Sequence, residues 1–244
     1  GVTLFSGHSS DADPHMATDC PLLTPQARAL NNYPAISQLL APPTKPIKET
    51  PTPESIDAVV ADFAAKPPMA GSPPIIVLAT DGLPDTCLDA NPNNGAPQDA
   101  ANAATVAAAQ RAYAAKIKLF YLFVGNNTAG DHPQRVANAG AGLDPLTGKA
   151  KFYVATDPTQ LSKAFNDIVG GVLSCDLTLS GQVDPIAGQA GIVTLNGNTL
   201  TYGTDWTIDN DGLTLHIINN ACNTLKAATN PTVDAVFACG AVIF

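Results

Sequence analysis

The sequence has few positively charged residues. Lysine and arginine together number 12, against 21 acidic residues, and the formal net charge is −9. Binding to a nucleic acid backbone or to an anionic membrane surface requires a basic patch, and the sequence contains no basic cluster. We therefore expect neither nucleic acid nor an anionic lipid surface among its partners.

Long apolar runs are also missing. The two longest runs, Ile75–Ala79 and Leu119–Val124, have the length of strands, whereas a membrane span needs roughly 18 apolar residues. We expect no membrane span. With 244 residues, 45% of them hydrophobic, the chain is long enough for one large domain or for a medium domain with a smaller one.

Short, metal-type cysteine spacings are absent as well. The five cysteines stand at positions 20, 87, 175, 222 and 239, with no C-x-x-C among them. This pattern favours disulfides over a zinc site and an oxidising compartment over the cytosol. We expect a secreted, cell-surface or periplasmic protein in which the odd number leaves one thiol free or paired outside this chain.

What the sequence does contain is a set of apolar strands that end in turn residues. In "PPIIVLATDGLPDTC" (residues 73–87), the run Ile75–Ala79 stops at Thr80, Asp81 and Gly82. Such a run is typical of a buried strand in a parallel sheet, and ligands of these sheets bind beyond the carboxyl ends of the strands. Asp81 is therefore a turn former or a site residue.

Strand and helix patterns alternate over residues 1–172. This alternation predicts an α/β fold with a doubly wound, mostly parallel, Rossmann-like sheet. Beyond Cys175, short strands with Gly, Asn and Asp turns predict a β-rich module over residues 173–244. The strands expected in the first domain are residues 1–5, 75–79, 116–125 and 151–156, and the helices begin near Thr52-Pro53, Pro97, Pro133 and Asp157.

Two segments together resemble the von Willebrand factor A (VWA) domain family. In "IIVLATDGLPD" a strand delivers an Asp-Gly pair, and in "KETPTPESIDAVVADF" a threonine loop precedes an amphipathic helix. The resemblance implies that Thr50 and Asp81 help to hold Mg²⁺ or Ca²⁺, with one coordination position open for a partner's carboxylate. The resemblance also places Asp11, Asp13, Thr52 and Gly82 on the rim around this ligand-binding site. The alternative for Thr50 and Asp81 is a helix cap and a turn.

The chain departs from the family at its beginning. The family's Asp-x-Ser-x-Ser motif and the central strand before it are missing, and the sequence begins at Gly1 with "GVTLF", which matches the second strand. The family's Gly-Gly before the threonine is replaced by Lys48 and Glu49. A sheet without its middle strand has two unpaired edges. We expect the strand to come from upstream, from an N-terminal segment or from another chain.

These observations predict a non-enzymatic adhesion or assembly domain that binds a protein or a glycan outside the cell. The alternative is a structural subunit of an extracellular polymer, completed by a strand from a neighbouring subunit. A third hypothesis is a hydrolase that uses Ser9, because "GHSS" half-matches a nucleophile elbow. The glycine after that elbow's serine is replaced and no helix is expected to come next, so we interpret this segment as a solvated loop.

Other acidic motifs have simpler interpretations. "DLTLS" (residues 176–180) matches the letters of the metal motif, but its alternation predicts a half-exposed strand. "DNDG" (residues 209–212) is interpreted as a hairpin turn and "DADPH" (residues 11–15) as a surface loop. Within the VWA-like arrangement we expect a Cys20–Cys87 disulfide at the ligand rim and a Cys222–Cys239 disulfide in the module, with Cys175 unassigned.

Overall fold

The computed structural model describes residues 1–7, 20–41, 49–68, 72–92, 94–126, 130–228 and 231–243. Their contacts divide the chain into two units, Gly1–Thr156 and Asp157–Phe244. The boundary expected from the sequence lies at residue 172, whereas α5 (Pro158–Val172) falls within the second unit. There α5 packs against α6 (Asn219–Ala227) so closely that a Cβ on Gly170 would collide with the Lys226 carbonyl oxygen.

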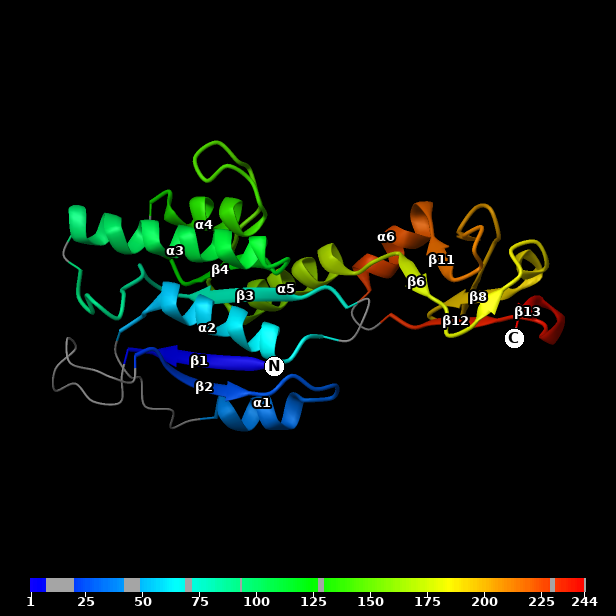
Figure 1. Ribbon diagram of the computed structural model, residues 1–244, viewed down its shortest axis with the longest axis horizontal. Helices are drawn as coiled ribbons and strands as arrows, with labels where there is room; N and C mark the ends of the chain where they lie inside the picture. The colour runs from blue at the N-terminus through cyan, green and yellow to red at the C-terminus, as the bar shows by residue number, and fades with distance from the viewer. Residues whose placement is uncertain are drawn as a thin grey trace. The chain divides into compact units, whose positions relative to one another are not determined.

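The first unit contains a parallel sheet of three strands (Figure 1). Its order is β3 (Ile75–Thr80), β4 (Lys118–Val124) and β5 (Tyr153–Ala155), with Ile75 opposite Lys118 and Leu122 opposite Tyr153. Between these strands the chain forms α3 (Ala96–Ala114) and α4 (His132–Gly140). The expected α/β class is thus confirmed.

A separate antiparallel pair precedes this sheet. β1 (Val2–Ser6) pairs with β2 (Leu22–Gln26), and α1 (Tyr33–Leu39) comes next without any buried residue. The strand β2 was not predicted because Pro25 interrupts its pattern, and proline is tolerated only in edge strands such as this one. Among the described residues the parallel part of the fold therefore has three strands, and the full doubly wound sheet stays a prediction.

The core of the first unit lies on one face of β4. Leu119, Tyr121 and Phe123 point to that face, where Ala108 and Ala109 of α3 are completely buried. Small alanine side chains let the helix approach the sheet closely. The helix α2 (Thr52–Ala65) packs on the same core through an apolar stripe that the sequence predicted.

The second unit is rich in short antiparallel strands, as expected. Trp206 is its largest fully buried side chain and packs edge-on to Tyr202, with ring centroids 5.0 Å apart. The segments "DLTLS" and "DNDG" form a strand and the turn between two strands, so both interpretations are confirmed. The strands are β6 (Asp176–Thr178), β7 (Gln182–Val183), β8 (Ile192–Leu195), β9 (Asn198–Leu200), β10 (Trp206–Ile208), β11 (Thr214–Ile217), β12 (Val233–Val236) and β13 (Val242–Ile243), in the sheets β10-β11-β6, β12-β8-β9 and β13-β7.

Candidate functional site

Four strands of the first unit leave one edge unpaired among the described residues, and β1 and β3 are the two whose side chains contribute to one core. Among the described residues, β1 pairs only with β2, and β3 pairs only with β4. We call these the free edges, meaning Val2–Ser6 and Ile75–Thr80. An unpaired edge presents a row of backbone N–H and C=O groups that can pair with another chain.

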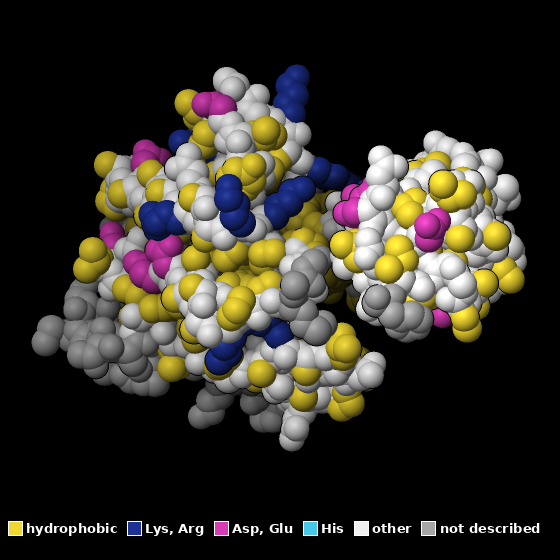
Figure 2. Space-filling model, turned by 45° about the vertical axis from the view of Figure 1, so that its right-hand side comes forward, with side chains coloured by type: hydrophobic (Ala, Val, Ile, Leu, Met, Phe, Trp, Pro, Cys, Tyr) yellow, Lys and Arg dark blue, Asp and Glu magenta, His cyan; other side chains and the backbone are white. Residues whose placement is uncertain are grey.

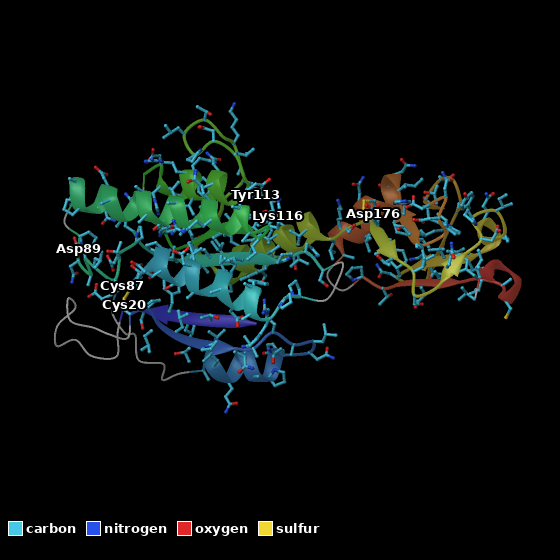
Figure 3. All side chains as sticks on the ribbon, viewed as in Figure 1. Cys20, Cys87, Asp89, Tyr113, Lys116 and Asp176 are labelled. Atoms are coloured by element: carbon cyan, nitrogen blue, oxygen red, sulfur yellow. A yellow bond between two sulfur atoms is a disulfide. The ribbon has the colours of Figure 1, made fainter. Side chains whose placement is uncertain are left out.

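The free edges point in the same direction. Leu22 lies opposite Ser6, so Cys20 stands near the carboxyl end of β1, and Cys87 comes after the carboxyl end of β3. These two cysteines form a disulfide with Cα atoms 5.6 Å apart, at one end of the first unit (Figure 3). The carboxyl ends of β1 and β3 therefore lie together, and the predicted Cys20–Cys87 pairing is confirmed.

The helix α2 runs along these strands in the opposite direction. At its start, Pro51 forms a bridge to Asp85, beyond β3. At its end, the Lys66 carbonyl accepts a hydrogen bond of 2.5 Å from Arg28, which comes after β2 at the amino end of β1. The Arg28 guanidinium also lies 4.1 Å from the centre of the Phe63 ring and fixes this end of the helix.

Apolar side chains of α2, β1 and β3 contribute to one core. Phe5 of β1 and Ile76 of β3 pack against the same core as the apolar stripe of α2, yet they stay only half-buried. In Figure 2, hydrophobic side chains gather across the middle of the first unit. The helix residues that contribute are Ile56, Val60 and Phe63.

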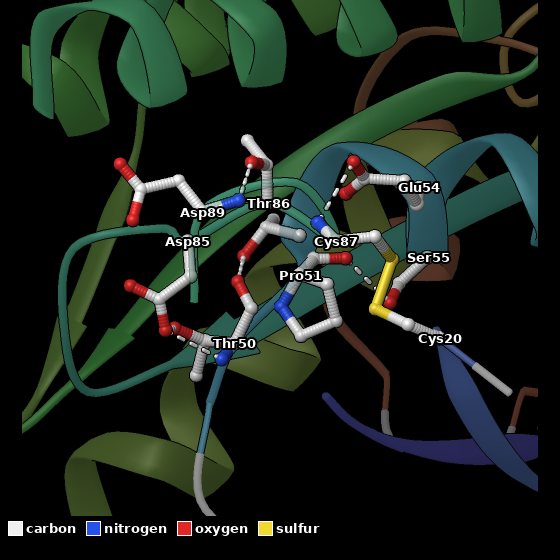
Figure 4. The surroundings of a disulfide bond; sticks show 10 residues. Cys20, Thr50, Pro51, Glu54, Ser55, Asp85, Thr86, Cys87 and Asp89 are labelled. Atoms are coloured by element: carbon white, nitrogen blue, oxygen red, sulfur yellow. Dashed lines mark hydrogen bonds between the residues drawn. A yellow bond between two sulfur atoms is a disulfide. The ribbon is translucent and has the colours of Figure 1, made fainter. Parts of the chain in front are cut away.

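Hydrogen bonds between Thr50 and Asp85 organise the rim at the carboxyl ends (Figure 4). The Thr50 amide donates to Asp85 Oδ2 at 2.8 Å, and the Thr50 hydroxyl lies 3.1 Å from both Asp85 Oδ2 and the Leu83 carbonyl oxygen. In return, the Asp85 amide donates to the Thr50 carbonyl at 2.9 Å. Thr50 therefore fastens the loop after β3 to the start of α2.

A carboxylate with one unused oxygen lies beside the disulfide. Glu54 Oε1 accepts a hydrogen bond of 3.1 Å from the Cys87 amide. Its other oxygen, Oε2, is buried and has no hydrogen-bond partner among the described residues. A buried carboxylate oxygen without a donor is costly, so this oxygen marks a place where a donor group is missing.

The residues predicted for a metal site are only partly brought together. Thr50 binds Asp85, a residue that was not predicted although it stands directly after Pro84 in the same turn. Asp81 is exposed directly after β3, and Gly82 is half-buried. In the described part of the chain, no group of three His, Cys, Asp or Glu side chains could hold a metal ion.

Thr52 does not have its predicted place on an open rim. It is 2% exposed, and its hydroxyl donates to the Thr50 carbonyl at 3.0 Å rather than capping the helix or lining an open rim. Two further predicted rim residues, Asp11 and Asp13, lie outside the described residues, as does Ser9 of the hydrolase hypothesis.

The predicted Cys222–Cys239 pairing is wrong. Cys222 bonds to Cys175 with Cα atoms 5.7 Å apart, and Cys239 is an exposed free thiol. The reason is the sheet register. β6 pairs with β11, and the Ile217 amide donates to the Cys175 carbonyl at 2.7 Å, which brings Cys175 to the start of α6.

A histidine between two carboxylates stands out in the second unit. His216 of β11 lies opposite Asp176 of β6, with Nδ1 2.6 Å from Asp176 Oδ1 and Nε2 2.6 Å from Asp209 Oδ1. A neutral imidazole carries only one N–H, so two carboxylate contacts favour the doubly protonated ring. Hydrogen bonds to Asp176 and Asp209 accordingly raise the pKa of His216.

Two buried titratable groups meet inside the first unit. The rings of Tyr121 and His132 lie edge to face, with centroids 6.2 Å apart. Burial raises the pKa of Tyr121 to about 12 and lowers the pKa of His132 to about 4. Both groups are therefore neutral at physiological pH and form part of the core.

No protein-family model, curated protein or solved structure matches this chain. The VWA resemblance accordingly remains a hypothesis that rests on the Asp-Gly strand and the threonine loop. Among the described helices, none combines the length and the apolar character needed to cross a bilayer. The two disulfides are consistent with a secreted protein.

Proposed function

We propose that the chain is an extracellular assembly domain whose first unit binds an extended segment of a neighbouring protein at the free edges of β1 and β3. One observation carries the proposal: the two edges flank one core, point the same way and lack partners among the described residues. Strand addition to such edges forms backbone hydrogen bonds and covers apolar side chains in one step.

The disulfides support the extracellular part of this proposal. The Cys20–Cys87 disulfide covalently links the segment that leads into β2, near the carboxyl end of β1, to the loop that comes after the carboxyl end of β3. A bridge there keeps the edges in place while no strand lies between them. In an oxidising compartment such a bridge persists, whereas cytosolic reductants would open it.

The first experiment is sedimentation velocity of the full chain over a range of concentrations, with two variants. Ala79 is exposed on β3, and Val154 is 47% exposed on β5, at the opposite edge of the sheet. A79K places a charge beside the free edge, and V154K is the matched control. We expect concentration-dependent association of the wild type and V154K, and a monomeric A79K chain.

Hydrogen exchange decides the outcome if the wild type is monomeric. The β3 amides on the free edge should then exchange faster than those of the central strand β4. A monomer whose β3 amides are all as well protected as β4 would overturn the proposal, because the edge would already be covered.

Metal-dependent adhesion is the second candidate function. The observation that favours it is the set of oxygen ligands at the carboxyl end of β3, where Asp81, Asp85 and the Thr50 hydroxyl all lie. Mg²⁺ and Ca²⁺ prefer such ligands. Ligand binding by this route would require the divalent cation, whereas strand addition would not, so removal of divalent cations separates the two.

A further inference from the structure

We infer that the segment bound at the free edges is a single apolar strand of five or six residues that runs parallel to β3 and pairs with both edges. This inference rests on the proposed function and specifies its partner. The length is set by β1, which has five residues, and by β3, which has six. A strand of this length can pair along the whole of both free edges.

The face toward α2 requires apolar side chains. Alternate residues of a strand point to the same face, and on this face Phe5 and Ile76 already pack against the core. Above them lies the stripe Ile56, Val60 and Phe63 of α2, of which only Ile56 is fully buried. An inserted strand would complete the burial of these side chains. Each aliphatic group that it covers would contribute to the binding free energy in proportion to the apolar area removed from water.

The opposite face also requires apolar side chains. Leu4 of β1 and Ile75 and Val77 of β3 lie on the face away from α2, because they alternate with Phe5 and Ile76. All three are only half-buried. A strand with apolar residues at every position, as in the interior of parallel sheets, fits both faces, whereas a strand that alternates apolar and polar residues fits only one.

The direction of the inserted strand is set by the strands that are present. β3, β4 and β5 are parallel to one another, and β1 points the same way as β3. A strand between β1 and β3 therefore forms the same kind of ladder on both sides. Sheets that are packed against helices are dominated by parallel pairings, so the inserted strand runs parallel and its carboxyl end reaches the Cys20–Cys87 disulfide.

Glu54 specifies the residue at the carboxyl end of the inserted strand. Its oxygen Oε1 is hydrogen-bonded to the Cys87 amide, so this carboxylate lies at the rim that the carboxyl end of the inserted strand would reach. Its buried oxygen Oε2 has no partner among the described residues. A hydroxyl or amide donor on the residue after the apolar run would satisfy this oxygen.

The test uses the full chain and a synthetic peptide, Lys-Lys-Val-Ile-Val-Ile-Val-Ser-Lys-Lys. Calorimetry measures its affinity, and hydrogen exchange measures protection of Val2–Ser6 and Ile75–Thr80. We expect binding to the wild type and to V154K, protection of both free edges, and weakening by about tenfold or more for A79K. Replacement of the peptide serine by alanine should weaken binding to the wild type but not to the variant E54A, which lacks the acceptor oxygen that the serine hydroxyl would satisfy.

N-methylated peptides test pairing with both edges. In a strand between two others, alternate residues direct their backbone groups to opposite neighbours. N-methylation of the odd or of the even apolar positions removes the donors for one edge, so each set should weaken binding about tenfold or more. If only one of the two N-methylated peptides binds more weakly than the unmodified peptide, the strand pairs with one edge alone and the inference is wrong.

Photo-crosslinking tests the direction. A benzophenone after the peptide's carboxyl-terminal end should label the rim near Cys87, and one before its amino-terminal end should label the region of Arg28. The reverse labelling would overturn the parallel direction. No binding of the peptide, together with self-association of the wild-type chain that A79K abolishes, would overturn this description of the strand while the proposed function stands. Absence of peptide binding overturns the inference in either case, and the proposed function is overturned as well if the wild type is monomeric and its β3 amides are all as well protected as those of β4.

Discussion

Thr50 contacts Asp85 through both its backbone amide and its hydroxyl, at 2.8 and 3.1 Å from the same carboxylate oxygen. Together with the return bond from the Asp85 amide to the Thr50 carbonyl, these contacts close the loop after β3 onto the start of α2. The residue that the VWA resemblance assigns to a metal thus has a structural partner in the chain itself.

We expect T50V to lower the free energy of unfolding by about 1–3 kcal/mol, because part-buried acceptors on Asp85 and Leu83 lose a donor. T50S keeps the hydroxyl and should lose less. Urea denaturation measures both variants. D89N, which changes a nearby carboxylate of the same loop, is the control and should stay within about 0.5 kcal/mol of the wild type. Equal stability of T50V and wild type would show that the Thr50–Asp85 contact does not hold the loop.

Removal of divalent cations should leave both association and peptide binding unchanged. The physical reason is that backbone hydrogen bonds and apolar contacts form the proposed interface, and no metal takes part in them. Sedimentation velocity and calorimetry in EDTA, and again after addition of Mg²⁺ or Ca²⁺, measure this. Loss of association in EDTA that Mg²⁺ restores would favour the metal-dependent candidate instead.

Peptide mapping of the non-reduced protein should recover Cys20 linked to Cys87 and Cys175 linked to Cys222, with a maleimide label on Cys239 alone. Removal of the first disulfide by C20S/C87S should destabilise the chain by roughly 4 kcal/mol in the chain-entropy model, because the bridge spans 67 residues. C239S should have no such effect. A recovered Cys222–Cys239 peptide would contradict the β6–β11 register.

We expect His216 to make the stability of the second unit vary with pH. Its pKa is raised in the folded state by Asp176 and Asp209, so its contribution to stability is fully present below the unfolded pKa of about 6.5. That contribution is lost as the pH rises through the folded pKa. An NMR titration of the imidazole measures the shift, and D176N and D209N should each lower the pKa. An unshifted pKa in the wild type would show that the two contacts do not persist in solution.

His132 should give the first unit the opposite pH dependence. Burial lowers its pKa to about 4, so the neutral ring stabilises the fold above the unfolded pKa of about 6.5. As the pH falls from there to about 4, the fold loses roughly 3 kcal/mol. H132F keeps an aromatic ring without a charge and should move the acid-unfolding midpoint of the first unit to lower pH. An unchanged midpoint would show that another group controls acid unfolding.

Local sequence patterns were sufficient for much of this fold. The strand at Ile75–Ala79 and the helices that begin near Pro97 and Asp157 were all predicted. The Asp157 carboxylate caps α5, because it accepts hydrogen bonds from the backbone amides of Thr159 and Gln160, at 2.8 and 2.9 Å. These features depend on residues that are close in the chain, where periodicity and capping chemistry act directly.

Features set by distant residues were harder to predict. The Cys175–Cys222 disulfide depends on the pairing of β6 with β11, whose register has no local signal. Asp85 was missed because a Pro-Asp turn is an ordinary loop sequence, and only the fold brings it to Thr50. The strand pairing of β1 with β2 was likewise hidden by Pro25.

Trp206 is the only tryptophan of the chain, and it is completely buried in the second unit. Its fluorescence emission therefore reports the unfolding of that unit alone, whereas far-ultraviolet circular dichroism reports helices of both. Two denaturation curves recorded on one sample should coincide if the units unfold together and separate if each unfolds independently. The chain thus carries an intrinsic optical probe for the cooperativity between its two halves.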